Sequence, residues 1–235
     1  KDPQLIINEV FAREFGFDLE KFEELKKQKF FEVEFAFIAR FDSLRISVKN
    51  YKKNYNYLFN FLNSIQTIKL SQIFSFIRNS IAPELDNNGI YKVVKIAQLK
   101  NGYIDYDNCE TVSNSFFQKN KDQLTIKKND IFIVNRGVGS IGKVDLCEEE
   151  TDEDFLIGGS IYILRELDNN FNHKFVTYFL RSVLGYFQME FGFFGNTNQI
   201  ALYLPILNNI KIPNIPLSEQ QRIVDEIKAE LDKQE

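Results

Sequence analysis

A glycine-rich loop near the middle of the chain carries side chains that could bind an anion. Arg136, Ser140 and Lys143 are interspersed with three glycines between two short apolar runs. Glycine permits positive φ and a close approach of the backbone to a ligand. Guanidinium, ammonium and hydroxyl groups on such a loop suit a phosphate or a guanine base. The alternative is a Gly-rich turn between two strands, with its charges merely solvated.

The spacing Gly137-x4-Gly142-Lys143 also matches most of a nucleotide-binding phosphate loop. That motif requires Ser or Thr after the lysine, to bind magnesium, and a helix that begins at the loop. Position 144 is Val, and the residues after it are typical of a strand. We therefore do not expect this chain to bind or hydrolyse ATP.

A second polar loop supplies candidates for contacts with base edges. They are Asn196, Thr197, Asn198 and Gln199. Asn and Gln can make paired hydrogen bonds to adenine in the major groove, and Thr can contact the methyl group of thymine. An ordinary polar loop is the alternative. Arg78 and Lys92 are further candidates, for phosphate contacts.

The composition is that of an ordinary globular protein, with 235 residues, 44% hydrophobic residues and a net charge of −4. Any nucleic-acid surface must therefore be a local patch. Cys109 and Cys147 form no zinc motif, which favours a reduced, cytoplasmic protein, although a single disulfide stays open. There is no signal peptide and no run of about 18 apolar residues, so we expect no membrane partner. The chain begins with Lys1 rather than Met and could be a fragment of a longer protein.

Hydrophobic periodicity predicts the elements that must position these loops. We expect helices over residues 4–15, 19–27, 51–65 and 174–184, and a final helix that begins with a capping box at Ser218 to Gln221. We expect strands at residues 30–38, 70–77, 91–96, 103–106, 131–134, 144–146 and 158–164. A turn of helix precedes the strand at 70–77, and 91–96 pairs with 103–106 as a hairpin. The acidic residues 148–154 form an exposed connection that points away from any DNA.

Four segments, in this order, resemble the target recognition domain of the specificity subunit of Type I restriction-modification systems. They are residues 91–102, 129–137, 139–143 and 212–223. The most specific piece is Pro216-Leu-Ser-Glu-Gln-Gln-Arg-Ile223, which leads into a long helix. The resemblance covers about residues 68–235. Residues 1–67 look like the segment that precedes such domains when they are fused behind an adenine methyltransferase.

The resemblance implies an α+β fold with three parts. A helical N-terminal appendage spans residues 1–67, a mixed, β-rich target recognition domain spans 68–216, and the start of a coiled-coil-forming spacer helix spans 217–235. The family implies that the recognition domain reads a few base pairs of double-stranded DNA. A partner subunit or a fused DNA methyltransferase domain carries S-adenosylmethionine and methylates adenine, and in some systems a further subunit cleaves the DNA.

The chain itself carries no methylation motif of the Asp/Asn-Pro-Pro-Tyr type, no Gly-rich cofactor motif and no nuclease pattern. We therefore expect a non-catalytic component with no bound cofactor or metal. Family subunits hold two recognition domains, and this chain has room for one. It could be a half-subunit that forms a homodimer through its C-terminal helix, or the end of a single-chain methyltransferase-nuclease. The alternative function is a protein-interaction scaffold that assembles through this helix without reading DNA.

Overall fold

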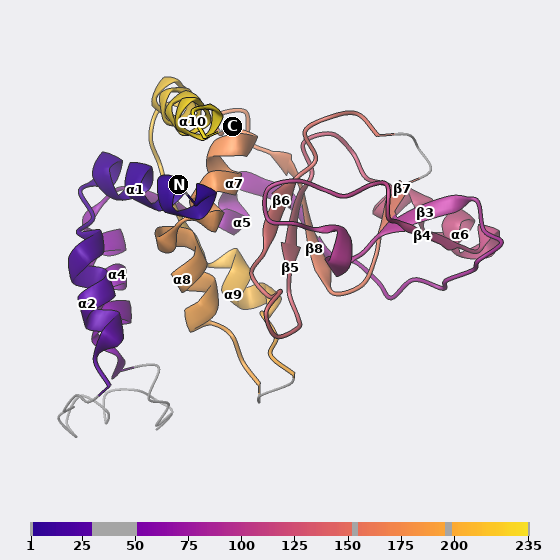
Figure 1. Cartoon of the computed structure of the whole chain (residues 1–235), viewed down its shortest axis with the longest axis horizontal. Coiled ribbons are helices and arrows are strands. Elements are labelled where there is room, and N and C mark those ends of the chain that lie inside the picture. Colours follow the sequence, from indigo (N-terminus) through magenta and orange to yellow (C-terminus); the bar gives the residue numbers. More distant parts are fainter. Residues whose placement is uncertain (1, 30–50, 152–154, 196–198, 235) are drawn as a thin grey trace.

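A four-stranded antiparallel sheet lies at the centre of the molecule (Figure 1). The computed structural model describes residues 2–29, 51–151, 155–195 and 199–234. The strands follow the order β2 (Phe74–Asn79), β8 (Ile161–Leu167), β5 (Ile131–Val134) and β6 (Val144–Leu146). The predicted strands at 131–134 and 144–146 are confirmed, and so is the turn of helix before β2, which is α5 (Leu70–Ile73). The predicted strand at 30–38 lies outside the described residues.

The central sheet is covered on both faces, which explains why β5 is apolar at every position. Successive side chains of a strand point to opposite faces. Ile131 and Ile133 pack into the core that the sheet shares with the helices, whereas Phe132 and Val134 pack into a second core under a smaller sheet. All four side chains are fully buried. Strand β5, and with it the start of the loop that follows, is therefore held from two sides.

The smaller sheet corrects one prediction. Its strands are β4 (Glu110–Val112), β3 (Tyr91–Val94) and β7 (Phe155–Ile157), and it lies with α6 (Asn114–Leu124) and the 3-10 helix η2 (Ile96–Gln98). The predicted hairpin between 91–96 and 103–106 is wrong, because β3 pairs with β4 and, in parallel, with β7. The buried carboxylate of Asp145 accepts hydrogen bonds from the N–H groups of Asn101 and Gly102, and this holds the turn against β6 instead.

Helices lie beyond the other face of the central sheet, some packed against it and the N-terminal ones farther away from it (Figure 1). They are α1 (Pro3–Phe15), α2 (Leu19–Lys27), α4 (Lys53–Ser64), α7 (His173–Arg181), α8 (Val183–Phe191), α9 (Leu204–Asn208) and α10 (Leu217–Asp232), with a two-stranded sheet of β1 (Thr67–Lys69) and β9 (Lys211–Pro213). Gly16 ends α1 with a φ of 71°, and the Asp18 side chain caps α2, which separates the two helices predicted at 4–15 and 19–27. The α+β class is confirmed. Within the described segments, no helix combines the length and the apolar character needed to cross a membrane.

The predicted helix at 174–184 is in fact two helices, because the backbone breaks at Ser182. The Ser182 hydroxyl donates a hydrogen bond to the carbonyl oxygen of Phe179 and accepts one from the N–H of Gly185. The side chain of Asn8, on α1, accepts a hydrogen bond from the N–H of Val183, 175 residues further along the chain. A distant residue therefore satisfies the donor that the break exposes.

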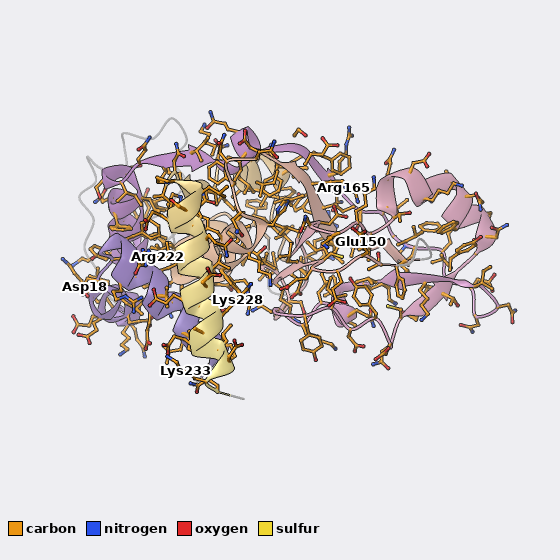
Figure 2. All side chains as sticks on the ribbon, turned by 90° about the horizontal axis from the view of Figure 1, so that it is seen from above. Asp18, Glu150, Arg165, Arg222, Lys228 and Lys233 are labelled. Carbon is orange, nitrogen blue, oxygen red and sulfur yellow. The ribbon has the colours of Figure 1, made fainter. Side chains whose placement is uncertain are left out.

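Helix α10 packs against α1 and α7. Ile223, Val224 and Ile227 are buried in this contact. Ion pairs join Arg13 to Glu226 and Arg222 to Glu14, and Figure 2 shows Arg222 on the side of α10 that faces the N-terminal helices. Side chains from the expected segments 1–67, 68–216 and 217–235 thus share one hydrophobic core.

The predicted capping box at Ser218 to Gln221 is wrong. Helix α10 begins one residue earlier, after Pro216, and no side chain caps it. Gln220 is instead fully buried, and its side-chain amide makes three hydrogen bonds to backbone groups. These groups belong to Asn170, Asn172 and Ile215. The amide thus joins the first turn of α10 to the turn before α7.

His173 is the only histidine in the sequence, and it begins α7. Burial lowers the pKa of its imidazole below the usual 6.5, and the negative charge of Asp130 only partly opposes this effect. Because the folded state disfavours the added proton, the stability that His173 contributes is present above pH 6.5 and is lost as the pH falls through the lowered pKa.

We therefore expect the single imidazole signal in an NMR titration to have its midpoint below 6.5 in the folded protein. The variant His173→Gln should show a smaller loss of unfolding free energy than the wild type as the pH is lowered from 6.5 through that midpoint. Urea unfolding at several pH values measures this difference. A midpoint at or above 6.5 would contradict the prediction.

Candidate nucleic-acid interface

Two loops that are far apart in the sequence meet at one end of the central sheet. The glycine loop, residues 135–143, follows β5, and the hairpin loop, described at residues 192–195 and 199–202, follows α8. Arg136 and Ala201 form an antiparallel bridge, and Ala201 also pairs with Phe194. Backbone hydrogen bonds of 2.8 and 2.9 Å secure these pairings. The sequence pointed to each loop separately, and the tertiary fold places them together at the lower end of the sheet in Figure 1.

The glycine loop is a tight connection between β5 and β6. The N–H of Gly142 donates to the carbonyl oxygen of Val134 at 2.9 Å, and the N–H of Val134 donates to the carbonyl oxygen of Lys143 at 3.0 Å. Gly142 has a φ of 83°, and a Cβ at this position would lie 2.9 Å from the ring of Tyr186. Lys143 is followed by a strand and not by a helix, which agrees with the exclusion of a nucleotide-binding loop.

The three candidate side chains of the glycine loop have different surroundings. Arg136 is exposed, and none of the described residues forms an ion pair or hydrogen bond with its guanidinium. Ser140 is half-buried within the turn. Lys143 is half-buried, and its Nζ lies 3.5 Å from the carbonyl oxygen of Leu99. Arg136 is thus the most available of the three to a ligand.

The hairpin loop contains the candidates for base contacts. Asn196, Thr197 and Asn198 lie outside the described residues, whereas Gln199 is described and exposed. Gly195 has a φ of 128°, and a side chain there would collide with the carbonyl oxygen of Gln199. Glycine is therefore required for the two sides of this hairpin to approach each other.

Arg78 is exposed near the end of the edge strand β2. Its guanidinium carbon lies 5.7 Å from the centre of the Phe76 ring, which is a cation–π distance. The neighbouring Asn79 accepts a hydrogen bond of 2.5 Å from the side-chain amide of Asn135. This bond joins the end of β2 to the start of the glycine loop, and sequence reasoning missed it because the two residues are 56 positions apart in the sequence.

The remaining cations are more distant from Arg136. The register places Arg78 level with Phe132, four residues before Arg136, so the two arginines are separated by roughly 13 Å along the strands. Lys92 is exposed on β3 in the smaller sheet, where its Nζ lies 5.1 Å from the centre of the Phe155 ring. The structure therefore places Gln199 two residues before Ala201, which pairs with Arg136, with Arg78 on the same sheet as β5 and Lys92 on another.

Acidic side chains lie at the opposite end of the central sheet. Leu146 pairs with Ile131, at the end of β5 that is remote from Arg136, and Glu148, Glu149 and Glu150 follow it. These three glutamates are exposed, as predicted for residues 148–154, and Glu148 forms an ion pair with Lys174. A phosphate backbone is attracted by a local cation and repelled by such a run of carboxylates. The charge distribution therefore favours the end of the sheet that holds Arg136.

A buried clasp holds residues 99–104 against β6. Asp145 accepts hydrogen bonds from the N–H groups of Asn101, at 3.0 Å, and Gly102, and Asn101 Oδ1 accepts one of 3.1 Å from the N–H of Val144. Burial raises the pKa of Asp145, against the opposing effects of these hydrogen bonds and of Arg181. Asn101 and Arg181 also line two neighbouring cavities of about 660 and 480 Å³. The clasp holds in place the segment that contains Leu99, whose carbonyl oxygen lies near Nζ of Lys143.

The described residues offer no metal or thiol chemistry. Among them, no group of three or more His, Cys, Asp or Glu side chains could hold a metal ion. Cys109 and Cys147 are free thiols, and burial raises the pKa of Cys109 to about 11 and also raises that of Cys147. Protonated thiols are poor nucleophiles. The groups that the end of the sheet with Arg136 presents are cations, amides and apolar side chains, which suit binding.

A family comparison identifies the class of protein to which such a surface belongs. The model of the Type I restriction modification DNA specificity domain matches residues 63–233, which is well over half of the chain. The chain belongs to this family. The match confirms the resemblance carried by residues 91–102, 129–137, 139–143 and 212–223. A comparison with curated protein sequences found no match.

Solved structures with a similar fold include members of the same systems. The S subunit of a Type I restriction-modification system from M. genitalium is 21% identical, with 70% of this chain and 38% of that chain covered and a TM-score of 0.47. A chain from a study of complex assembly in the type I R-M system is 14% identical, with 95% and 51% covered and a TM-score of 0.51. The type IIG restriction endonuclease BpuSI is 11% identical, with 79% and 29% covered and a TM-score of 0.52. This specificity-domain chain thus spans about half or less of each of these proteins.

Proposed function

We propose that this specificity-domain chain reads a short sequence of double-stranded DNA and directs an adenine methyltransferase to it. The methyltransferase, a partner subunit or a fused domain, binds S-adenosylmethionine and performs the reaction, and the chain itself is non-catalytic. The observation that carries the proposal is the meeting of the glycine loop and the hairpin loop around the exposed Arg136. The family membership of residues 63–233 supports it.

The two loops carry groups of the right chemistry for this task. A guanidinium such as that of Arg136 can donate two hydrogen bonds to O6 and N7 of guanine, and an amide such as that of Gln199 can pair with N6 and N7 of adenine. Arg78 suits a phosphate further along the duplex, and Ser140 and Lys143 can contribute from within the glycine loop. The net charge of −4 means that only this local patch attracts DNA. Affinity therefore depends on the methyltransferase closing around the duplex.

Selection from a randomised duplex library tests the proposal directly. The chain is used with and without its matching methyltransferase, and bound duplexes are sequenced. Enrichment of one short motif in either arm supports sequence recognition. Enrichment only with the methyltransferase shows that the DNA affinity of the chain depends on the methyltransferase. No enrichment in both arms would overturn the proposal in favour of a scaffold.

Replacing Arg136 with alanine should weaken binding to the selected duplex by roughly 1–3 kcal/mol if the guanidinium contacts a guanine. Fluorescence anisotropy with the methyltransferase present measures this change. The matched control is Lys128→Ala, which removes an exposed cation at the opposite end of β5 and should change affinity much less. Equal losses in both variants would mean that Arg136 contributes only net charge, and an unchanged affinity in Arg136→Ala would rule out its role.

The family resemblance also allows a homodimer that forms through α10. The apolar stripe that such a dimer needs, Ile223, Val224 and Ile227, is buried within this chain against α1 and α7. A second copy would have to displace α1 or use another face of α10. Sedimentation of the chain at several concentrations distinguishes a monomer from a dimer. We leave the homodimer outside the proposal because no observation favours it.

A further inference from the structure

Two large aromatic side chains are exposed where the glycine loop and the hairpin loop meet. Phe194 is 61% exposed and Tyr203 is 49% exposed, with ring centroids 6.1 Å apart. Single exposed apolar residues are common, but a group of them beside a functional surface indicates a contact with a partner. The backbone of Phe194 is held by two hydrogen bonds to Ala201. The ring is therefore presented to solvent from an ordered backbone.

The strand pairing fixes where Phe194 lies relative to Arg136. Phe194 pairs with Ala201, and Ala201 pairs with Arg136. Residues directly opposite each other in an antiparallel pair point to the same side, so all three side chains share one face. Two strand spacings separate the backbones of Phe194 and Arg136, which is about 10 Å. The small side chain of Ala201 lies between them, and both larger groups protrude beyond it.

The charge of this face selects the kind of partner. Arg136 is exposed and has no ion pair among the described residues, and the acidic run follows the far end of β6. An anionic partner is therefore favoured over a protein surface that carries no negative charge. In the major groove of DNA, the apolar group available to an aromatic ring is the 5-methyl group of thymine. With a rise of about 3.4 Å for each base pair, 10 Å corresponds to about three base pairs.

We propose that Phe194, supported by Tyr203, is a specificity-determining residue that packs on the methyl group of a thymine in the target sequence. This thymine lies about three base pairs from the position that Arg136 contacts. The inference rests on the proposed DNA-reading function and deepens it, because it predicts part of the target. The alternative is that this face binds a protein instead of DNA. The deoxyuridine experiment distinguishes the two partners.

The test replaces single thymines of the selected duplex by deoxyuridine, which lacks only the methyl group. With the methyltransferase present, wild-type protein should bind one such duplex about fourfold more weakly, as expected for the loss of one buried methyl group. Phe194→Ala should bind more weakly than the wild type and should no longer distinguish thymine from deoxyuridine at that position. Phe194→Leu, which keeps an apolar contact, should retain part of the discrimination.

Controls separate this inference from a folding defect and from the wider proposal. Ile90→Ala removes a side chain that is 74% exposed in the smaller-sheet region and should leave the discrimination unchanged. Thermal unfolding of each variant checks that the fold is intact. If a motif is enriched but Phe194→Ala and wild type respond equally to deoxyuridine at every position, the thymine contact is wrong while DNA reading stands. If no motif is enriched, the DNA-reading proposal itself has failed.

Discussion

Replacing Asp130 with alanine is expected to lower the free energy of unfolding by roughly 3–5 kcal/mol, because it leaves a buried arginine without its partner. The Asp130 side chain is fully buried, and that of Arg165 is only 11% exposed. Arg165 Nε and Nη2 donate to the two carboxylate oxygens at 2.7 and 2.6 Å, and Nη2 also donates to the carbonyl oxygen of Thr125. The Asp130 carboxylate accepts one further hydrogen bond, from the N–H of Lys127.

The pair also bears on function, because Asp130 directly precedes β5 and Arg165 lies in the neighbouring strand β8. It secures the strand that ends at the glycine loop. Urea unfolding, followed by circular dichroism, measures the midpoint and the slope. The matched control is Glu23→Ala, which breaks the exposed pair with Lys26 and should cost no more than about 1 kcal/mol. Similar losses in both variants would show that the buried pair contributes no more than a surface one.

Replacing Gln220 with alanine should destabilise the chain by roughly 2–4 kcal/mol, because three backbone groups lose their hydrogen bonds to a fully buried amide. The side-chain oxygen accepts from the N–H of Asn172 at 2.8 Å. The side-chain nitrogen donates to the carbonyl oxygens of Asn170 and Ile215, both at 2.9 Å. The Gln220 side chain itself is fully buried.

The adjacent residue provides the control, because Gln221 has the same side chain on the exposed face of α10. Its hydrogen bonds to Asn172 and Asp225 are solvent-exposed, so Gln221→Ala should cost about 0.5 kcal/mol. Urea unfolding of both variants gives the comparison. Equal effects would mean that the buried amide is not what joins α10 to the turn before α7.

Gln220 also gives a physical reason for the most specific piece of the family resemblance. In Pro216-Leu-Ser-Glu-Gln-Gln-Arg-Ile223, Gln220 binds the turn before α7, and Ile223 begins the buried stripe of α10. Sequence reasoning assigned these residues to a capping box, because Ser followed by Gln at a spacing of three fits that motif. The helix begins earlier, and it is the neighbouring Gln220 whose side chain makes buried tertiary contacts.

Local signals in the sequence were sufficient for elements whose ends depend on nearby residues. Gly16 and Asp18 separate α1 from α2 through left-handed φ and side-chain capping, which act within a few residues. The apolar run of β5 and the glycines after it predict a strand and a tight turn for the same reason. The family resemblance, too, was carried by short segments in a fixed order.

Long-range contacts decided the features that the local patterns did not predict. The energy of these contacts comes from groups that are remote in the sequence. The turn at Asn101 joined β6 through the buried Asp145, and Ser182 broke a helix whose new end is satisfied by Asn8. Neither partner is visible in a local pattern.

The same distinction between local signals and long-range contacts applies to the candidate site. Arg136 could be selected from its residue type and loop, although its contact with DNA stays a prediction, as do those of Ser140, Lys143 and Gln199. Phe194 resembles any core phenylalanine in this Phe-rich sequence, and only the pairing of Phe194, Ala201 and Arg136 makes it an exposed neighbour of the arginine. Residue chemistry is thus readable from the sequence, whereas exposure and proximity depend on strand register, which tertiary packing sets.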